Sequence, residues 1–170
     1  IYVSEVMWWL YRPLTFMIWG GVFERFPKLK AMIVEGGTMF MLPPWLRLLD
    51  HNYTDVQFSA KLGDFRSHLS MKPSEYFRRN CGIGASCVPR ADLELRQLIG
   101  TELIMWGSDF PHPEGTWPNT DKYYRDTFSN FPEDDGRKIL GGNAIDFHQL
   151  DENRLRSIAD DIGPTADLFS

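Results

Sequence analysis

The stretch that decides the fold is residues 103–117, LIMWGSDFPHPEGTW, in which a short apolar run leads to an acid and then a histidine. An uninterrupted apolar run such as residues 103–106 is typical of a strand buried on both faces, and Gly107-Ser108 marks the point where the chain leaves the sheet. Asp109 is therefore expected at the carboxyl end of a strand. Parallel α/β sheets and barrels carry their binding and catalytic residues at that end.

A second apolar run ends in an acid in the same way. Residues 29–35, LKAMIVE, predict a short strand that carries Glu35 at its end and is closed by Gly36-Gly37. In a parallel sheet Glu35 and Asp109 would lie at the same edge, where two carboxylates can bind a cation or one can move a proton. The alternative is that each acid caps the N-terminus of the helix that follows it.

Helical and strand patterns alternate along the chain, which implies βαβ units, a parallel sheet and the α/β class. Only three strand-helix units fit in 170 residues. Because an eight-unit barrel needs about 250 residues, the chain could supply only the C-terminal part of such a TIM barrel. We treat residues 1–170 as a single domain. The patterns predict helices at 1–26 (broken at Arg12-Pro13 and Gly20-Gly21), 38–53, 91–99, 120–128, 133–140 (closed by Gly141-Gly142), 143–147 (capped by Asn143) and 151–162, and a turn leading into a strand at 74–83.

The composition indicates a soluble domain with a small-molecule ligand. Hydrophobic residues make up 43% of the chain, and 18 basic against 23 acidic residues give a net charge of -5 without a Lys/Arg block, which argues against a nucleic-acid partner. No segment approaches the ~20 apolar residues that span a bilayer, and no signal peptide is recognisable, so no membrane partner is expected. The chain starts at Ile1 inside a helical pattern, as a piece of a longer protein would.

The two cysteines are predicted to stay reduced. Cys81 and Cys87 would lie about 20 Å apart along an extended strand, whereas a disulfide requires Cα atoms within about 7 Å. Reduced thiols favour a cytoplasmic protein. A buried structural role is the usual one for such residues, and a reactive thiol is the alternative.

His112 is the histidine best placed for chemistry. Pro111 and Pro113 restrict the backbone on either side of it, so it can serve as a ligand, an acid/base group or a substrate donor. The alternative is a surface histidine in a rigid turn. Trp117, in the same loop, is taken as a further substrate contact. Ordinary structural explanations suffice for His51, His68 and His148.

Several common motifs are missing from the sequence. No two histidines lie within five positions of each other, so no pair is spaced to share a metal ion, and a complete zinc site is not encoded. The glycine-rich dinucleotide loop, the Walker-type phosphate loop and the Gly-x-Ser-x-Gly nucleophile elbow are absent as well.

Four motifs nevertheless carry a resemblance to a known family. They are GGVFERFPKLK at 20–30, EGG at 35–37, MWGSDFPHPEG at 105–115 and ILGGNA at 139–144. In order and spacing they resemble the C-terminal half of the amidohydrolase-related family, in the branch that includes aminocarboxymuconate-semialdehyde decarboxylase and related metal-dependent hydrolases.

The resemblance implies a (β/α)8 barrel, of which this chain would form strands six to eight with their helices. It implies that Asp109 is the acid at the end of strand eight that contacts the metal and takes a proton from bound water. At the end of strand six the decarboxylase relatives carry a histidine where this chain has Glu35, so Glu35 binds metal, contacts substrate or marks altered chemistry. The family's other histidine ligands would precede Ile1, which leaves the metal site incomplete here.

The resemblance therefore predicts that the intact parent is a metal-dependent enzyme, with zinc as the expected divalent ion. It would hydrolyse or decarboxylate a small cyclic or aromatic carboxylate, with Asp109 on the metal and with His112, Glu35 and Trp117 on the substrate. The alternative is a non-catalytic half-barrel that binds a ligand or pairs with another chain. Exposed strand edges would favour association of the chain by itself, and a homo-oligomer is one form that this could take.

Overall fold

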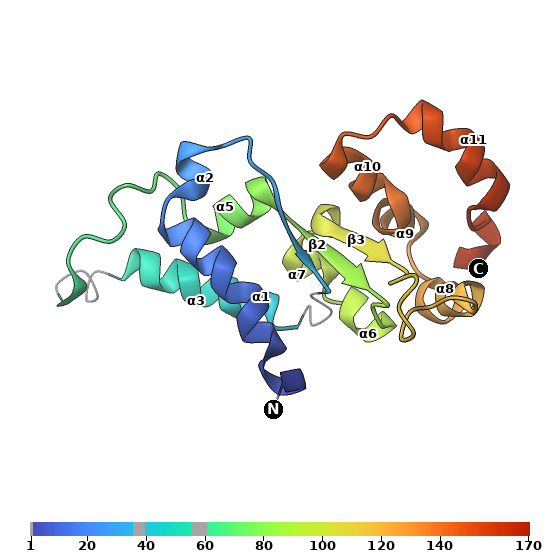
Figure 1. Ribbon diagram of the computed structural model, residues 1–170, viewed down its shortest axis with the longest axis horizontal. Coiled ribbons are helices and arrows are strands. Elements are labelled where there is room, and N and C mark those ends of the chain that lie inside the picture. Colours follow the sequence, from blue (N-terminus) through green and yellow to red (C-terminus); the bar gives the residue numbers. More distant parts are fainter. Residues whose placement is uncertain (1, 36–39, 56–60) are drawn as a thin grey trace.

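Three parallel strands form the centre of the protein (Figure 1). The computed structural model describes residues 2–35, 40–55 and 61–170. The strands β1 (Ala31–Val34), β2 (Cys81–Ser86) and β3 (Ile104–Gly107) follow one another in the sheet in the order β1-β2-β3. Their central residues are in register, and the apolar side chains there are buried. The predicted α/β class with a parallel sheet is confirmed.

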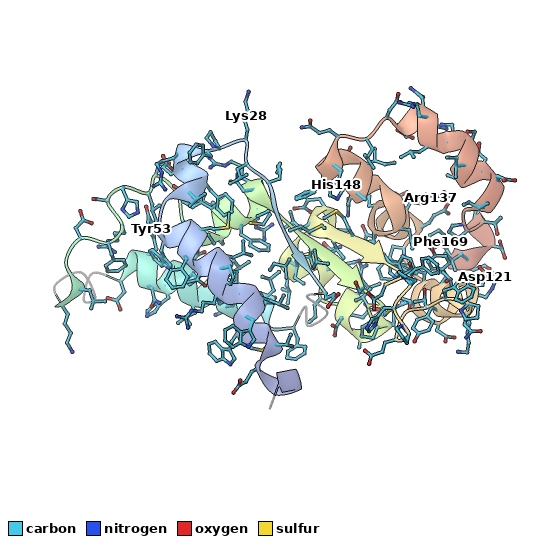
Figure 2. All side chains as sticks on the ribbon, viewed as in Figure 1. Lys28, Tyr53, Asp121, Arg137, His148 and Phe169 are labelled. Carbon is cyan, nitrogen blue, oxygen red and sulfur yellow. The ribbon has the colours of Figure 1, made fainter. Side chains whose placement is uncertain are left out.

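The helices lie in two groups beside this sheet. In Figure 1 the helices α1, α3 and α5 lie to the left of the sheet, and α8 to α11 lie to its right. The first group packs mainly around α5, whereas α10 and the turn before it pack against β3. Side chains of both groups fill the space around the sheet (Figure 2). Within the described ranges no helix is both long enough and apolar enough to cross a membrane.

The first helix, α1 (Tyr2–Trp19), runs through Pro13, so the predicted break at that residue is wrong. A proline inside a helix removes one backbone hydrogen bond and costs about 3 kcal/mol. Here Tyr11, Leu14 and Ile18 form a buried stripe that extends past the proline on both sides. Burying three large side chains against α3 and α5 offsets that cost, and the helix continues.

The next elements follow the sequence pattern. Gly21 has a φ of 67°, a left-handed conformation that glycine adopts readily, and it separates α1 from α2 (Val22–Arg25) as predicted. Helix α3 (Leu42–Thr54) carries its two prolines in the first turn, where the backbone N–H groups have no partner within the helix. Its predicted start at 38 lies outside the described residues.

Helix α5 (Pro73–Asn80) replaces the turn predicted for the first part of 74–83, and that prediction is wrong. The Glu75 carboxylate accepts a hydrogen bond from the Lys72 backbone N–H at 2.7 Å, which fixes the start of the helix. Its buried side chains, among them Tyr76 and Phe77, recur at helical spacing. Only the second part of the predicted segment is a strand, β2.

Two short helices connect β2 to β3, where the sequence predicted one at 91–99. They are α6 (Arg90–Leu93) and α7 (Arg96–Ile99), and a 3-10 turn, η1 (Thr101–Leu103), follows them. Because this turn takes up the start of the apolar run, β3 begins one residue later than predicted.

The C-terminal helices confirm most predicted segments. Helices α8 (Thr120–Phe128) and α11 (Glu152–Ile162) form as expected. The predicted break at Gly141-Gly142 is wrong, because α9 (Glu133–Arg137) continues through a π-helical turn, η2 (Lys138–Gly142), into α10 (Asn143–His148). Glycine permits a left-handed exit from a helix but does not require one, and Gly142 keeps right-handed angles. A last 3-10 turn, η3 (Ala166–Phe169), ends the chain.

Asn143 joins the start of α10 to β3. The sequence predicted it as a helix cap, but its side-chain amide donates instead to the backbone carbonyls of Thr101 and Ile104, each at 2.7 Å. Both carbonyls lie where β3 begins, and Asn143 is buried. The residue therefore fixes the position of the strand that leads to Asp109.

A hydrogen-bond network connects α2 to α5. The buried Tyr76 hydroxyl donates to the Glu24 carboxylate and accepts from the backbone N–H groups of Ser70 at 2.9 Å and Met71 at 3.3 Å. The bond from Tyr76, followed by the bond from the Ser70 hydroxyl, holds the pKa of Glu24 below its usual value.

We expect Tyr76→Phe to lower the free energy of unfolding at pH 7 by about 1–2 kcal/mol, because two backbone N–H groups lose their acceptor. Urea denaturation measures the change, and Tyr123→Phe, at an exposed tyrosine, should leave stability unaltered. Since the pKa of Glu24 is lower in the folded state, its stabilisation is present at neutral pH and is lost as the pH falls through that pKa. The gap between wild type and Tyr76→Phe should therefore narrow in acid. A constant gap from neutral pH into strong acid would contradict this assignment.

Candidate functional site

Three polar residues follow the three parallel strands with the same unusual backbone conformation. Glu35 after β1, Cys87 after β2 and Asp109 after β3 have φ values of 58°, 48° and 59°. Left-handed angles cost a residue other than glycine roughly 1–2 kcal/mol, and such strain concentrates at functional sites. These three strained positions lie at the carboxyl edge of the sheet, where parallel α/β folds bind ligands, whereas Asn130 and Gln149, which also have a positive φ, follow the helices α8 (Thr120–Phe128) and α10.

These strand ends line one small polar pocket. Its volume is about 250 Å³, and its lining residues are Glu35, Ser86, Cys87, Asp109, His112 and Glu114. The prediction that Glu35 and Asp109 share an edge of the sheet is thereby confirmed, and His112 joins them. Their roles in catalysis or binding stay predictions.

Asp109 and His112 form the one carboxylate–imidazole pair in the described part of this pocket's lining. The His112 Nδ1 atom lies 3.1 Å from the Asp109 Oδ2 atom, and the His112 backbone N–H donates to the Asp109 carbonyl at 2.8 Å. The Asp109 side chain is 25% exposed and that of His112 is 56% exposed, so both reach the pocket while staying accessible to a ligand. A carboxylate in this position can orient the imidazole and accept or hold a proton.

The loop after β3 holds this pair in place by close backbone packing. The Thr116 backbone N–H donates to the Ser108 carbonyl and the Gly115 backbone N–H to the His112 carbonyl, each at 2.9 Å. A Cβ atom at Gly115 would lie within 3.0 Å of the carbonyl oxygens of Ser108, Asp109 and His112. Only glycine fits there, so the loop closes tightly around Asp109.

Neither Glu35 nor Asp109 caps the N-terminus of the helix that follows it, so the alternative role considered for these two acids is wrong. Helix α3 has Met41 at its N-cap and α8 has Asn119, and in both helices the side chain of the cap residue makes no capping hydrogen bond. Several residues separate Glu35 and Asp109 from these helix starts. Their side chains are therefore available to the pocket.

Trp117 lies apart from the other predicted site residues. It is not among the residues that line the pocket, its side chain is 68% exposed, and its ring meets the edge of Phe110 at a centroid distance of 5.9 Å. The structure therefore does not bring Trp117 to the site.

Cys87, Ser86 and Glu114 line the pocket although the sequence did not predict them as site residues. The only sequence signal for these three residues was their position. Ser86 ends β2, Cys87 follows it, and Glu114 lies two residues after His112. Burial, and then the nearby Asp109 charge, raises the pKa of the Cys87 thiol, which contacts the carbonyl of Ser108 at 3.8 Å. The thiol is therefore neutral near pH 7.

Both cysteines are free, as predicted. Cys81 is buried in β2, and burial raises the pKa of its thiol to about 12, which fits a structural role. The other three histidines also lie away from the pocket. His51 on α3 pairs with Asp55, which follows the helix. The His68 ring contacts the Trp19 carbonyl at 2.8 Å, and the His148 ring lies edge-on to that of its neighbour Phe147.

The side chains that line the pocket are of types that bind metal ions, but too few of them are arranged to hold one. Carboxylate oxygen and imidazole nitrogen are ordinary zinc ligands, and a catalytic zinc site has three protein ligands. Within residues 2–35, 40–55 and 61–170, no group of three or more His, Cys, Asp or Glu side chains is arranged to hold a metal. The described residues can therefore supply part of a metal site and not all of it.

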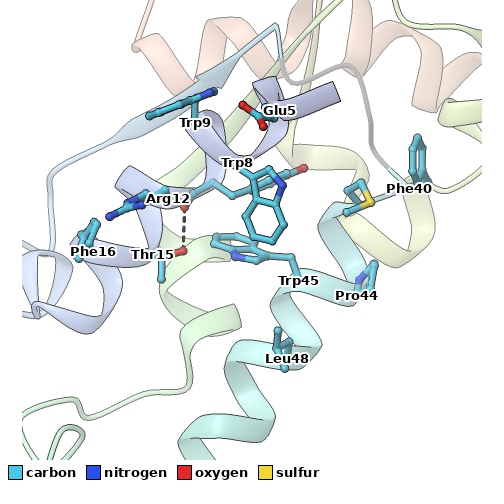
Figure 3. A pocket seen from close by; sticks show the side chains of 12 residues that line it. Glu5, Trp8, Trp9, Arg12, Thr15, Phe16, Phe40, Pro44, Trp45 and Leu48 are labelled. Carbon is cyan, nitrogen blue, oxygen red and sulfur yellow. Dashed lines mark hydrogen bonds between the residues drawn. The ribbon is translucent and has the colours of Figure 1, made fainter. Parts of the chain in front are cut away.

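A larger hollow of about 990 Å³ lies between α1 and α3 (Figure 3). Its walls are mainly aromatic and aliphatic, and Trp8, Trp45 and Phe16 face it together with the charged side chains of Glu5 and Arg12. It has the size of a ligand site, but it contains no acid–histidine pair. The smaller polar pocket is the better candidate for chemistry.

Comparison with known proteins agrees with the motifs. A family model described as Amidohydrolase matches residues 10–150. A 2-amino-3-carboxymuconate-6-semialdehyde decarboxylase from Dictyostelium discoideum is 29% identical over 138 residues, which are 81% of this chain and 36% of that protein.

Two solved structures are similar over most of this chain. The 5-carboxyvanillate decarboxylase from Sphingomonas paucimobilis is 33% identical with a TM-score of 0.61, over 79% of this chain and 38% of that one. An amidohydrolase from Mycobacterium avium subsp. paratuberculosis is 30% identical with a TM-score of 0.61, over 79% of this chain and 32% of that one. The chain thus spans between 32% and 38% of the length of these three relatives. Because the family model covers most of its residues, the chain belongs to the amidohydrolase family.

Proposed function

We propose that this chain is the C-terminal part of a (β/α)8 barrel and that β1, β2 and β3 are its sixth, seventh and eighth strands. Two features support this placement: the similarity to a small share of two longer structures, and a parallel sheet whose outer strands β1 and β3 each pair with only one other strand among the residues that the structure describes. We use the term intact enzyme for a protein that contains this chain together with the remainder of such a barrel.

We propose further that the intact enzyme is a metal-dependent hydrolase or decarboxylase whose active site includes the polar pocket. The single observation that carries this proposal is the Asp109–His112 pair at the carboxyl edge of the sheet, 3.1 Å apart and open to the pocket. Barrel enzymes place their reacting groups at this edge. A small-molecule substrate fits the pocket size, and the free cysteines agree with a cytoplasmic location.

In this proposal Asp109 has two tasks. It supplies a carboxylate oxygen to a divalent ion, zinc by family resemblance, with the other ligands coming from the remainder of the barrel. When bound, such an ion supplies Lewis acidity and lowers the pKa of water. Asp109 also accepts the proton released at that position, and His112 keeps its carboxylate oriented through the Nδ1 contact.

Glu35 gives the pocket a second strand-end carboxylate. By the family resemblance, decarboxylase relatives carry a histidine at the position of Glu35. A glutamate there brings a negative charge and an oxygen ligand in place of a neutral nitrogen. We propose that Glu35 contacts the substrate or the ion directly from the end of β1. Trp117 is exposed and does not line the pocket. It is therefore a substrate contact only if its loop lies over a bound substrate.

Decarboxylation of a cyclic or aromatic carboxylate is the first choice among the reactions. Two of the three relatives compared are named as decarboxylases. The third is named only as an amidohydrolase, so hydrolysis of an ester, lactone or amide is the second choice.

The test is a metal-dependence assay on the intact enzyme with a panel of aromatic and enol carboxylates and, in parallel, lactones and amides. We expect that removing metal with a chelator abolishes turnover, that zinc restores it, and that a carboxylate substrate releases one CO₂ for each molecule consumed. Turnover that is unchanged in metal-free enzyme would overturn the proposal.

The alternative is a non-catalytic scaffold that keeps the fold and binds a ligand, because fold by itself does not fix function. A metal-loaded protein that binds members of the carboxylate panel without converting any of them would favour this alternative.

A further inference from the structure

Thr116 is a buried polar residue in the loop that joins β3 to α8 (Figure 1). The residue is 1% exposed, whereas Glu114 and Trp117 in the same loop are exposed. A hydroxyl that is removed from water costs free energy unless it finds hydrogen-bond partners within the protein. Thr116 does not line the polar pocket, so its hydroxyl serves the loop and the elements beside it.

The Thr116 hydroxyl has two oxygen partners. It lies 3.1 Å from the Thr120 hydroxyl and 3.4 Å from the Ser108 carbonyl oxygen. A hydroxyl has one hydrogen to donate and can also accept. Because the Ser108 carbonyl can only accept, both contacts are satisfied when Thr120 donates to Thr116 and Thr116 donates to Ser108. The hydroxyl thus connects the first residue of α8 to the residue that follows β3.

The Ser108 carbonyl oxygen is the point on which several donors converge. Besides the Thr116 hydroxyl, it accepts the Thr116 backbone N–H at 2.9 Å, and the Cys87 thiol sulfur lies 3.8 Å away. The thiol comes from the end of β2, whereas both Thr116 groups come from the far side of the loop. This single oxygen is therefore held from two directions.

Holding the Ser108 carbonyl also holds Asp109. The Ser108 carbonyl and the Asp109 backbone nitrogen belong to one planar peptide group, and the orientation of this plane sets the φ angle of Asp109. That angle is 59°, a strained value that relaxes unless neighbouring contacts keep it. On its other side, the Asp109 carbonyl accepts the His112 backbone N–H at 2.8 Å. Both peptide groups that flank Asp109 are fixed, and with them the direction in which its side chain leaves the backbone.

We propose that Thr116 is a positioning residue for Asp109 and that its hydroxyl acts through the Ser108 carbonyl. The inference rests on the function proposed above, in which Asp109 binds the metal ion and accepts a proton. Residues that orient a metal ligand from behind typically change metal affinity or activity by about 10–100-fold when they are removed. The Thr116 hydroxyl shares its task with a backbone N–H and a thiol, so we expect the lower end of that range.

Substitutions at Thr116 in the intact enzyme separate the hydroxyl from the packing of the side chain. Thr116→Val keeps the branched shape and loses the hydroxyl, whereas Thr116→Ser keeps the hydroxyl and loses the methyl group. We expect the valine variant to lose about tenfold in kcat and about tenfold in zinc affinity, and the serine variant to stay within about twofold of wild type in both. A role in packing alone predicts the reverse order, because serine leaves a void and valine does not.

Steady-state kinetics and competition with a chromogenic zinc chelator measure these effects. The KM of Thr116→Val should stay within about twofold of wild type, because Thr116 does not line the pocket and its loss affects the reacting group instead of substrate binding. The matched control is Thr127→Val, the same change at a buried threonine of α8 outside this loop, which should leave kcat and zinc affinity as in wild type.

Circular dichroism shows whether each variant is folded. If Thr116→Val did not fold, Thr116→Ala would replace it and would be compared with Thr116→Ser, because these two variants differ only in the hydroxyl. We then expect alanine to lie about tenfold below serine in kcat and in zinc affinity.

Asp109→Asn, measured in parallel, separates the failure of this inference from the failure of the proposed function. If Asp109→Asn lost activity and zinc affinity while Thr116→Val kept both, or if serine proved more damaging than valine, the positioning role of Thr116 would be overturned and the role of Asp109 would stand. If Asp109→Asn itself kept both, the proposed function would fail, and the role of Thr116 would fail with it.

Discussion

Asp109→Asn in the intact enzyme is expected to lower kcat by about a thousandfold, within the 10²–10⁴ range of a lost acid/base group. The amide keeps the size of the carboxylate but cannot accept the proton or supply a charged oxygen to the metal. Asparagine is the informative substitution because Asp109 has a φ of 59°, and asparagine tolerates left-handed angles better than alanine does. Steady-state kinetics with metal in excess measures the effect.

The matched control for Asp109 is Asp121→Asn, the same chemical change in the first turn of α8, at an exposed residue outside the lining of the pocket. We expect its kcat to stay close to that of wild type, because Asp121 does not line the pocket. If Asp109→Asn retained more than about a tenth of wild-type kcat while remaining folded, Asp109 would not be the proton-handling group proposed here.

Asn143→Ala is expected to give a large loss of stability, about 3 kcal/mol in the free energy of unfolding. The change removes two hydrogen bonds of 2.7 Å and leaves the carbonyls of Thr101 and Ile104 without their amide donor at the start of β3. Buried carbonyls deprived of a donor lose their solvation as well as the bond. Chemical denaturation of the chain gives the value.

Asn153→Ala on the exposed helix α11 is the control for this variant, because it removes the same amide without uncovering a buried partner. It should change stability by less than about 0.5 kcal/mol. Equal losses of stability from Asn143→Ala and Asn153→Ala would contradict this assignment. They would show that the hydrogen bonds from Asn143 to the start of β3 contribute nothing beyond the loss of an asparagine side chain.

The sheet and its carboxyl edge could be predicted from the sequence because its outer strands, β1 and β3, are short apolar runs with a definite end. The runs before Glu35 and Asp109 identify their strands, and the parallel order follows from the helices between them. Such signals are local, and the structure confirms them.

Features that depend on packing between distant segments could not be predicted in the same way. Pro13 marks a break by local rules, yet the buried stripe around it keeps α1 continuous. Asn143 has the sequence position of a cap, whereas its partners Thr101 and Ile104 lie about forty residues earlier and only the fold brings them close. The contribution of Cys87 to the pocket likewise depends on the side-by-side pairing of β2 with β3.

The loop after β3 contains one contact that the sequence could predict and one residue whose position it could not predict. His112 meets Asp109 because only two residues separate them and a tight turn closes between them, so proximity in sequence was enough. Trp117 lies farther along the same loop, and the packing of its ring on Phe110 takes it away from the pocket. Loop direction beyond a few residues depends on tertiary contacts that a sequence pattern does not contain.

The central claim is that a metal ion of the intact enzyme binds at the carboxyl edge of this sheet with Asp109 as a ligand. An anomalous-difference map from crystals of the zinc-loaded intact enzyme tests it directly. We expect one peak in each chain at about 2.0–2.2 Å from a carboxylate oxygen of Asp109, beside His112 and Glu35. A well-occupied metal peak elsewhere in the barrel, with the Asp109 carboxylate outside bonding distance, would contradict it.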